Sequence, residues 1–261
     1  MNDILEKAFR LKENKSAVVL RWMRVSKTIF SNGMSIYKPS NHQYIVMHHV
    51  DVSMEAEIYG ANNRLAEHNA EHFKEHGVRA FDLLGAIGSG KTSLIEQLVP
   101  ELQKRGLVTA AIAGDVYGDD DFQRIVKTGI QAYNANTGKE CHLDAHLVHH
   151  ALDHMNLDGV NVVFIENVGN MVCPTDFKLG AEKRIVVIST TEGDDVVNKH
   201  PMMFRDCNIA VINKVDLAEA VGCNVERMIA DIKRYNPEMV IIKTVLKKGE
   251  GVAEVADAIL A

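Results

Sequence analysis

The octapeptide GAIGSGKT at residues 85–92 constrains the fold more than any other feature of this chain. It matches the pattern G-x-x-x-x-G-K-[ST], follows the apolar run 80–84 and precedes the amphipathic run 93–98. A strand, a glycine turn and a helix in that order form a phosphate-binding loop, because glycines let backbone N–H groups converge on phosphate oxygens at the positive end of a helix. The sequence therefore predicts a P-loop and a bound nucleoside triphosphate.

Two side chains of this loop have predicted chemical roles. Lys91 is expected to reach the β- and γ-phosphates as a catalytic cation, and the Thr92 hydroxyl is expected to bind Mg²⁺. The whole set predicted to hold the nucleotide here is Gly85, Gly88, Ser89, Gly90, Lys91, Thr92 and Ser93.

Composition narrows the class of protein. The chain has 261 residues, of which 46% are hydrophobic and 25% are charged, and its formal net charge is −6. A negative net charge argues against nucleic acid as a partner, and no apolar run approaches the roughly 20 residues needed to span a bilayer. Four cysteines without a recognisable signal peptide indicate reduced thiols. We therefore expect a cytoplasmic protein that meets neither nucleic acid nor membrane.

The first 46 residues differ from the rest. They carry eight Lys or Arg against three acidic residues, and they contain the single tryptophan, Trp22. Because they show no sustained periodicity and no motif, we interpret residues 1–46 as a basic extension outside the core, poorly ordered or docked late. Helical patterning starts just after Met47, so we place the P-loop domain at residues 47–261. Whether Met47 begins the functional unit is a hypothesis that mass spectrometry of the natural N-terminus would test.

Residues 51–76 are predicted to form a helix that stops at Gly77. His68, His72 and His76 share a second face of this helix at i, i+4 and i+8. A solvated face is the simpler interpretation of these histidines, and an accessory metal-binding stripe is the alternative.

Strands and helices then alternate along the chain. The apolar, β-branched runs show no polar alternation, which suits parallel strands buried on both faces. The predicted strands are 79–84, 107–113, 130–133, 160–165, 184–188, 208–212 and 239–242. The predicted helices are 91–105, 122–126, 144–155, 216–221, 224–236 and 251–260. This order predicts an α/β fold with an open, mostly parallel sheet and helices on both faces.

The tetrapeptide Asn213-Lys214-Val215-Asp216 follows a predicted strand and has the N-K-x-D pattern of guanine-reading loops. The Asp216 carboxylate can accept hydrogen bonds from N1–H and the exocyclic amine of guanine, a donor pair that adenine lacks. Asn213 is expected to steady the base edge, and Lys214 to lie along the ring plane. The predicted nucleotide is therefore GTP.

Acidic residues at strand ends supply candidates for the Mg²⁺ shell. Glu166 and Gly169 belong to the segment ENVG, where G proteins usually place D-x-x-G, so Glu166 is expected to bind Mg²⁺ through water and Gly169 to reach the γ-phosphate. Asp115 is a second candidate. Asp121 ends a loop trio that is either a solvated turn or a group near Mg²⁺ or the attacking water. No glutamine or arginine finger is evident, so we predict slow GTP hydrolysis.

A thiol–imidazole set predicts a second metal. Cys141 and His142 precede a predicted helix that carries His146, and Cys173 lies seven residues after Glu166. Sulfur and imidazole ligands suit Ni²⁺ or Zn²⁺, with His146, water or a second subunit as the fourth ligand. The competing interpretation is that the thiols are inert and the histidines solvated.

Together these residues resemble the HypB family, the GTPases of [NiFe]-hydrogenase maturation. The stretches that carry the resemblance are 85–92, 136–146, 164–170, 189–195 and 213–216, and the similarity covers residues 47–261. The resemblance implies a P-loop GTPase that dimerises with GTP. It also implies nickel or zinc at the subunit interface on Cys141, His142 and Cys173, with His146 and His150 as further candidates. The implied partners are a HypA-like nickel-binding maturation protein and the hydrogenase large subunit.

The chain departs from that family in two places. Residues 1–46 contain no cysteine and one histidine, His42, so we expect no extra N-terminal nickel store. The last guanine loop carries Val245, whose side chain cannot donate a hydrogen bond, so a backbone N–H would have to replace it. Three other functions stay open at this point: a small-molecule kinase, a urease-type nickel GTPase, and a module in which the metal is structural zinc.

Overall fold

The computed structural model describes residues 52–261, and the prediction of a separate basic extension at 1–46 and a start at Met47 therefore falls outside the described residues. The chain divides into units 1–58 and 59–261. The first unit contributes the beginning of helix α3 (Val52–Glu75). The architecture below is that of the second unit.

The core of the unit is one seven-stranded sheet in which every pairing between strands is parallel. The strand order is β3-β2-β4-β1-β5-β6-β7, and the prediction of an open parallel sheet is confirmed. The strands are β1 Arg79–Leu84, β2 Thr109–Asp115, β3 Gln131–Asn136, β4 Val162–Glu166, β5 Lys183–Ser189, β6 Ile209–Asn213 and β7 Val240–Lys243.

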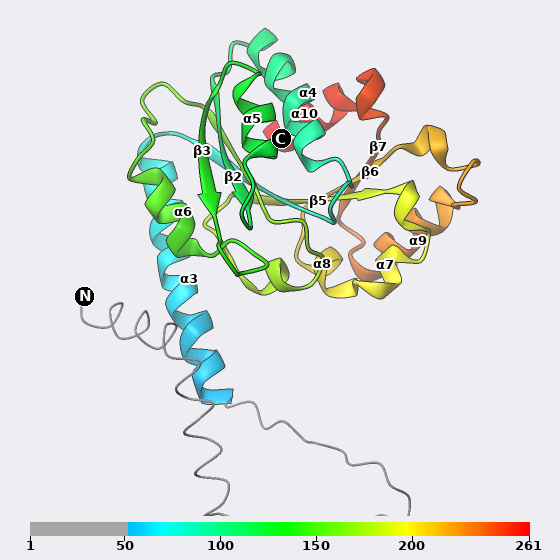
Figure 1. The fold of residues 1–261 in the computed structure, drawn as a ribbon. Helices are drawn as coiled ribbons and strands as arrows, with labels where there is room; N and C mark the ends of the chain where they lie inside the picture. Colours follow the sequence, from blue (N-terminus) through cyan, green and yellow to red (C-terminus); the bar gives the residue numbers. More distant parts are fainter. Residues whose placement is uncertain (1–51) are drawn as a thin grey trace, which may run out of the picture. The chain divides into compact units, whose positions relative to one another are not determined.

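Helices cover both faces of the sheet, as the alternation predicted (Figure 1). One face carries α4 (Lys91–Lys104), α5 (Asp120–Val126) and α10 (Val252–Leu260). The other face carries α3 and α6 (Ala145–Leu152) beside one another, and then α7 (Val196–Lys199), α8 (Pro201–Arg205) and α9 (Val225–Tyr235).

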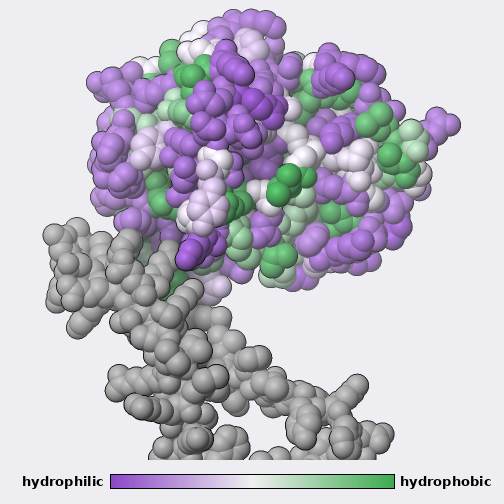
Figure 2. Space-filling model, viewed as in Figure 1, coloured by the Kyte–Doolittle hydropathy of each residue, from purple (hydrophilic) through white to green (hydrophobic). Residues whose placement is uncertain are grey.

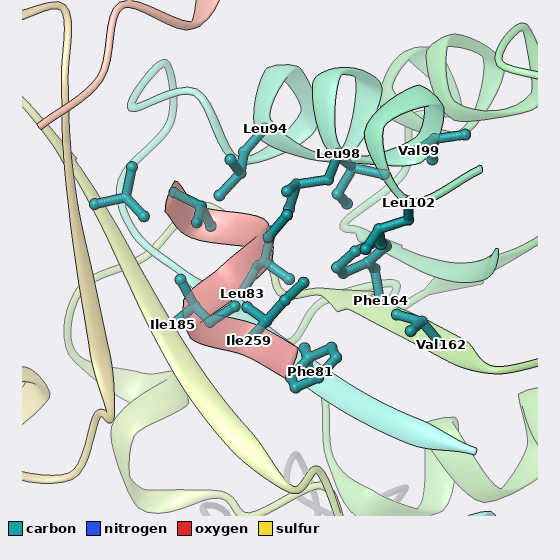
Figure 3. Close-up of a cluster of buried hydrophobic side chains, with 14 of the residues drawn as sticks. Phe81, Leu83, Leu94, Leu98, Val99, Leu102, Val162, Phe164, Ile185 and Ile259 are labelled. Atoms are coloured by element: carbon teal, nitrogen blue, oxygen red, sulfur yellow. The ribbon is translucent and has the colours of Figure 1, made fainter. Parts of the chain in front are cut away.

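The main core lies between the sheet and the helices α4 and α10 (Figure 3). Phe81 and Leu83 of β1, Phe164 of β4 and Leu98 of α4 are fully buried there. Burial of side chains of this size contributes about 1.5–3 kcal/mol each. The rigid sheet therefore fixes the loop between β1 and α4, which is the phosphate loop.

Most predicted elements lie within two or three residues of the observed ones, but one helix prediction is wrong. Residues 216–221 do not form an α-helix; a 3₁₀ helix at Val215–Leu217 stands there. Lys214 before it has a left-handed φ of 58°, and Gly222 after it a φ of 65°, so the segment is confined between two turns. The short helices α7 and α8 were not predicted, because four- and five-residue helices carry too little periodicity.

All seven strands run the same way, so their carboxyl ends meet along one edge. The segments that follow β1, β2, β3, β4 and β6 contain the predicted site residues. In the described part of the chain, no helix has the length and apolar character that crossing a bilayer requires.

Candidate functional site

The phosphate loop turns between β1 and α4 with its backbone held by the guanine-type loop. Gly90 is the N-cap of α4 with φ 115°, and a Cβ at this position would overlap the side-chain amide of Asn213. Asn213 Nδ2 donates to Ser89 O over 2.9 Å. Glycine is therefore required at position 90 both by the backbone angle and by the close approach of β6.

Lys91 lies across this loop. Its Nζ donates to the carbonyl oxygens of Gly85 at 3.2 Å and Ala86 at 3.3 Å. The side chain is 6% exposed, and burial lowers the pKa of its ammonium while nearby carboxylates, Glu166 first among them, oppose that change. The Ser89 hydroxyl is buried and lacks a hydrogen-bond partner. The Lys91 ammonium and the Ser89 hydroxyl are hydrogen-bond donors at a helix N-terminus that lack strong acceptors, and such donors suit phosphate oxygens.

Thr92 brings two acidic residues together. Its hydroxyl lies 2.8 Å from Asp121 Oδ1 and 2.7 Å from Glu166 Oε1. A hydroxyl has one hydrogen and cannot donate to both oxygens, so the arrangement calls for a proton on one carboxyl or a cation among the three. Glu166 Oε2 is buried and has no partner, and burial raises the pKa of this carboxyl to about 7. This oxygen-rich set with an orphaned acceptor fits Mg²⁺.

The remaining residues predicted near the nucleotide lie at the same edge of the sheet. Asp115 ends β2, but its Oδ1 accepts from the Val116 backbone at 2.6 Å, and no hydrogen bond joins it to Thr92 among the described contacts. Asp121 is in the first turn of α5, not in a loop. Ser93 Oγ accepts from Arg124 at 2.9 Å. Gly169 packs so closely on Ile87 that a Cβ there would overlap it.

The guanine-type loop after β6 is braced internally. Asn213 is buried, and besides its bond to Ser89 its Oδ1 accepts from the Lys214 backbone at 2.8 Å. It therefore positions two loops, a role not predicted for it. Lys214 Nζ donates to Gly88 O at 2.8 Å. The side chain of Asp216 is 31% exposed, and its Oδ2 pairs with Lys248 Nζ at 3.2 Å.

The backbone of the loop that contains Val245 is already engaged. The Val245 N–H donates to Glu250 O at 3.1 Å, and the Leu246 N–H lies 3.3 Å from Asn213 Oδ1. These two N–H groups are therefore engaged within the protein in this structure, and a backbone contact from this loop to a base stays a prediction.

Cys141, His142 and Cys173 come together, with their ligand atoms within 4.8 Å of one another. Cys141 Sγ lies 3.8 Å from His142 Nδ1, and the His142 ring stacks on Phe177 with centroids 3.9 Å apart. The facing Cys173 thiol raises the pKa of Cys141. A cation would reverse that effect by favouring the thiolates, so the donor set fits a metal of the Ni²⁺ or Zn²⁺ type.

The structure does not add the further histidines to this cluster. His146 is the second residue of α6 and is exposed, and it is not one of the residues whose ligand atoms converge in the described chain. His150 is 3.1 Å from the Tyr133 hydroxyl and stacks on His154. The prediction of His146 as a ligand stays a prediction.

A buried polar network that the sequence did not reveal holds both cysteine segments. Asp82 of β1 accepts from Asn167 Nδ2 at 3.2 Å and from Arg184 Nε at 3.2 Å. Asn167 Oδ1 in turn accepts from the backbone N–H of Leu143, the residue after His142, at 3.0 Å. Arg184 donates to the carbonyls of Pro174 and Thr175, directly after Cys173. Asp82 therefore links the two halves of the metal cluster.

The same segment reaches the phosphate side. Asn167 is the neighbour of Glu166 in the chain, and Asn170 pairs with Gly85 of the phosphate loop in an isolated bridge. Asn170 Nδ2 also donates to Cys141 O at 3.3 Å. Residues 166–173 therefore contain one of the two carboxylates beside Thr92 and also contact the cysteine cluster.

Two more charged residues near the phosphate loop escaped prediction. Glu192, in the capping box after β5, has a buried Oε2 without a partner, and burial raises the pKa of its carboxyl to about 7 against the charges of Lys214 and Lys91. Arg124 of α5 pairs with Asp121 at 3.3 Å and with Glu96 at 2.6 Å. Glu192 lies in the stretch 189–195 that resembles the HypB family, but only the fold places it near Lys214 and Lys91.

The parallel sheet and its glycine loop define a P-loop nucleotide-binding protein. Comparisons with known proteins agree: residues 80–243 match the family model described as CobW/HypB/UreG, nucleotide-binding domain. The chain is 51% identical over 214 residues to the probable hydrogenase maturation factor HypB of Methanocaldococcus jannaschii, covering 82% of this chain and 96% of that relative. The chain belongs to the HypB family of hydrogenase maturation factors.

Solved structures support this assignment. HypB from Archaeoglobus fulgidus is 48% identical with a TM-score of 0.71, over 76% of this chain and 96% of that one. HypB from Helicobacter pylori, solved in complex with nickel, is 30% identical with a TM-score of 0.73, over 77% of this chain and 94% of that one.

Proposed function

We propose that this chain is a GTP-hydrolysing metallochaperone that binds nickel, with zinc as the competing ion, and assists nickel insertion into [NiFe]-hydrogenase. The observation that carries the proposal is that one segment, residues 166–173, begins at the carboxylate beside Thr92 and ends at a cysteine of the thiol–imidazole cluster. A change at the nucleotide therefore acts directly on the metal ligands.

On the nucleotide side, Thr92, Asp121 and Glu166 would hold Mg²⁺, which when bound neutralises phosphate charge. Lys91 would leave its loop carbonyls and bind the phosphates. Asp216 would read guanine after Lys248 releases its carboxylate. The contacts that support these roles are the short ones at Thr92 and the surface pair at Asp216. Arg124, the arginine beside the phosphate loop, is tied to Glu96, Asp121 and Ser93, so we keep the prediction of slow turnover.

The metal is cargo at the second site. Two thiols and an imidazole bind Ni²⁺ and Zn²⁺ with similar preference, so ligand type alone favours neither. Cys141 is exposed, which suits an ion that must enter and leave. The nickel complex of the Helicobacter pylori relative supports nickel.

Asn167 and Asn170 are the coupling residues in this proposal. Movement of Glu166 towards a bound cation displaces Asn167, which holds the Leu143 backbone beside His142. Movement of the phosphate loop at Gly85 displaces Asn170, which holds the Cys141 carbonyl. A coupling of this kind is typically worth about 1–3 kcal/mol, or roughly five- to 150-fold in metal affinity.

A tetrahedral ion on three ligands needs a fourth, which water or a second copy of the chain would supply. We therefore keep the predictions of a homodimer formed with GTP, of a HypA-like nickel-binding partner and of the hydrogenase large subunit as recipient. A cytoplasmic location likewise remains a prediction from the sequence.

Simple observations distinguish the proposed function from the three competing functions. A small-molecule kinase would show no guanine preference, and the family assignment argues against it. A urease-type GTPase shares the family model, but the relatives that are 51% and 48% identical to this chain are hydrogenase maturation factors. A structural zinc would make folding depend on Cys141.

The decisive experiment is a Ni²⁺ titration of the full chain loaded with Mg·GDP or with a non-hydrolysable Mg·GTP analogue, with oligomer mass measured in the same samples. We expect nickel affinities that differ at least fivefold between the two states. Cys223→Ser, a cysteine outside the cluster, is the matched control and should titrate like the wild type. Equal affinities with the dimer present would remove the switching mechanism, and turnover of tens of GTP per second would refute slow hydrolysis.

A further inference from the structure

Histidines from two helices gather on one surface outside the cysteine cluster. His68 and His149 meet edge to face, with ring centroids 5.1 Å apart, although they belong to α3 and α6. His72 stacks on His76 at 4.7 Å. Burial lowers the pKa of His72, and His76, His149 and His68 are near enough to lower it further. The stripe on α3 is therefore joined by a histidine from a second helix, which the sequence did not indicate.

Hydrogen bonds fix which nitrogen of His149 carries the proton. Asn69 Nδ2 donates to the carbonyls of Ala145 at 2.9 Å and Leu179 at 3.2 Å, so its Oδ1 is an acceptor. That oxygen lies 3.2 Å from His149 Nδ1, which must therefore donate. In the neutral ring the lone pair is then on Nε2, the atom available to a metal.

A hydrogen bond also fixes the proton of His76 on Nδ1. Its Nδ1 lies 3.0 Å from the His72 carbonyl oxygen, which can only accept. Nε2 of the neutral His76 ring therefore also holds a lone pair. His68 and His76 are exposed and His72 and His149 are half-buried, so the cluster is open to ions from solvent. The left edge of the molecule around α6 is largely hydrophilic (Figure 2).

The ring spacings suit a shared ion. With metal–nitrogen bonds of about 2.0–2.1 Å, the centroids of two imidazoles on one tetrahedral ion lie about 5 Å apart. The edge-to-face His68–His149 pair has this spacing, with ring planes 83° apart. The stacked His72 and His76 rings are 4.7 Å apart with planes only 20° apart, so one of them must turn before their in-plane lone pairs can meet at one ion. In the described chain the ligand atoms of these residues do not converge as those of Cys141, His142 and Cys173 do, so rotation of the His68 and His72 side chains must complete the site.

We propose that His68, His72, His76 and His149 form a second metal site that binds a divalent transition-metal ion such as Ni²⁺ or Zn²⁺ through imidazole nitrogens. Imidazole suits these ions, whereas Mg²⁺ and Ca²⁺ prefer oxygen. One residue of this site, His149, lies on α6, the helix that begins three residues after His142 of the cysteine cluster. Its occupancy does not depend on which ion the cysteines carry or on GTP.

The test is equilibrium dialysis of Ni²⁺ alone against the full chain carrying Cys141→Ser and Cys173→Ser, which removes the thiolates. We expect nickel to remain bound, with nitrogen and oxygen but no sulfur neighbours in X-ray absorption at the nickel edge. Adding His72→Gln or His149→Gln should weaken that binding by about tenfold or more. Circular dichroism confirms folding, and His72→Gln carries the test alone if loss of the Asn69 contact unfolds the His149 variant.

The matched control is His150→Gln with His154→Gln, a stacked pair on and just after α6 that lacks a partner ring from α3 among the described contacts. This variant should bind nickel as tightly as the serine parent. The proposal is overturned if the serine parent binds no nickel, if His72→Gln and His149→Gln leave the affinity unchanged, or if the control pair weakens binding equally.

Discussion

Glu166 allows the physics of the nucleotide site to be tested without any nucleotide. Its carboxyl is 2% exposed, and burial raises its pKa from 4.5 to about 7, more than the charge of Lys91 lowers it. A raised pKa means that the native state binds this proton more tightly than the unfolded chain does. Its contribution to stability is therefore full below about pH 4.5 and is lost as the pH rises through about 7.

The perturbation is Glu166→Gln, which keeps the size of the side chain and removes its charge. A rise in the pKa of Glu166 from 4.5 to about 7 sets an upper bound of about 3 kcal/mol on this effect. In urea unfolding of the metal- and nucleotide-free chain, wild type and variant should differ little at pH 5. At pH 8 the variant should be the more stable by up to about 3 kcal/mol.

Magnesium nucleotide should reverse this order. Wild type gains stability by binding Mg·GDP, whereas the variant lacks one of the carboxylates beside Thr92 and should gain less. Glu192→Gln is the matched control, because the pKa of Glu192 is also raised to about 7 but its carboxyl bonds the Ser189 backbone instead of Thr92. A constant difference between wild type and Glu166→Gln from pH 5 to pH 8 would mean that Glu166 stays ionised, and the reasoning would be wrong.

Three further outcomes are expected. Asp216→Asn should weaken GDP binding by about 1–3 kcal/mol, roughly five- to 150-fold, in competition assays, with no such loss for ADP. Asp82→Asn should lower the free energy of unfolding by up to about 3–5 kcal/mol, because it leaves the largely buried Arg184 without its counter-charge. It should also weaken nickel binding at the cysteine cluster, and unchanged nickel affinity would disprove the bracing role. The double variant Cys141→Ala, Cys173→Ala should lose nickel binding at that cluster. Its circular dichroism spectrum and unfolding midpoint should stay near the wild-type values, because Cys141 is exposed and both residues lie outside the hydrophobic core. An unfolded variant would indicate structural zinc.

The sequence alone was sufficient for the chain of elements and for the phosphate loop. Residues 79–84 were predicted as a strand and form β1. The glycines of the phosphate loop are recognisable because a backbone that contacts phosphate must turn tightly there. These features are local, because glycine conformations, strand runs and helix periodicity depend on neighbours in the chain. The segment 216–221 shows the limit, since it follows a lysine in a left-handed conformation and forms only a 3₁₀ turn at its start.

Residue types at strand ends also predicted which loops meet, because parallel strands end at one edge. They did not predict how those loops are held. In the sequence, nothing distinguishes Asp82 from its neighbours in β1, yet its carboxylate accepts hydrogen bonds from Arg184 and Asn167. Asn213, expected at the base, braces the phosphate loop.

Local sequence patterns were enough to predict the P-loop, the guanine-type tetrapeptide and the three residues of the cysteine cluster. Tertiary structure alone decided which acid stands at Thr92, with Asp121 there and Asp115 turned to its own backbone. It alone brought His149 of α6 to the histidines of α3. Contacts between residues some 30 to 120 positions apart depend on how helices seat on the sheet, and that is set by packing of the whole core, which no local pattern encodes.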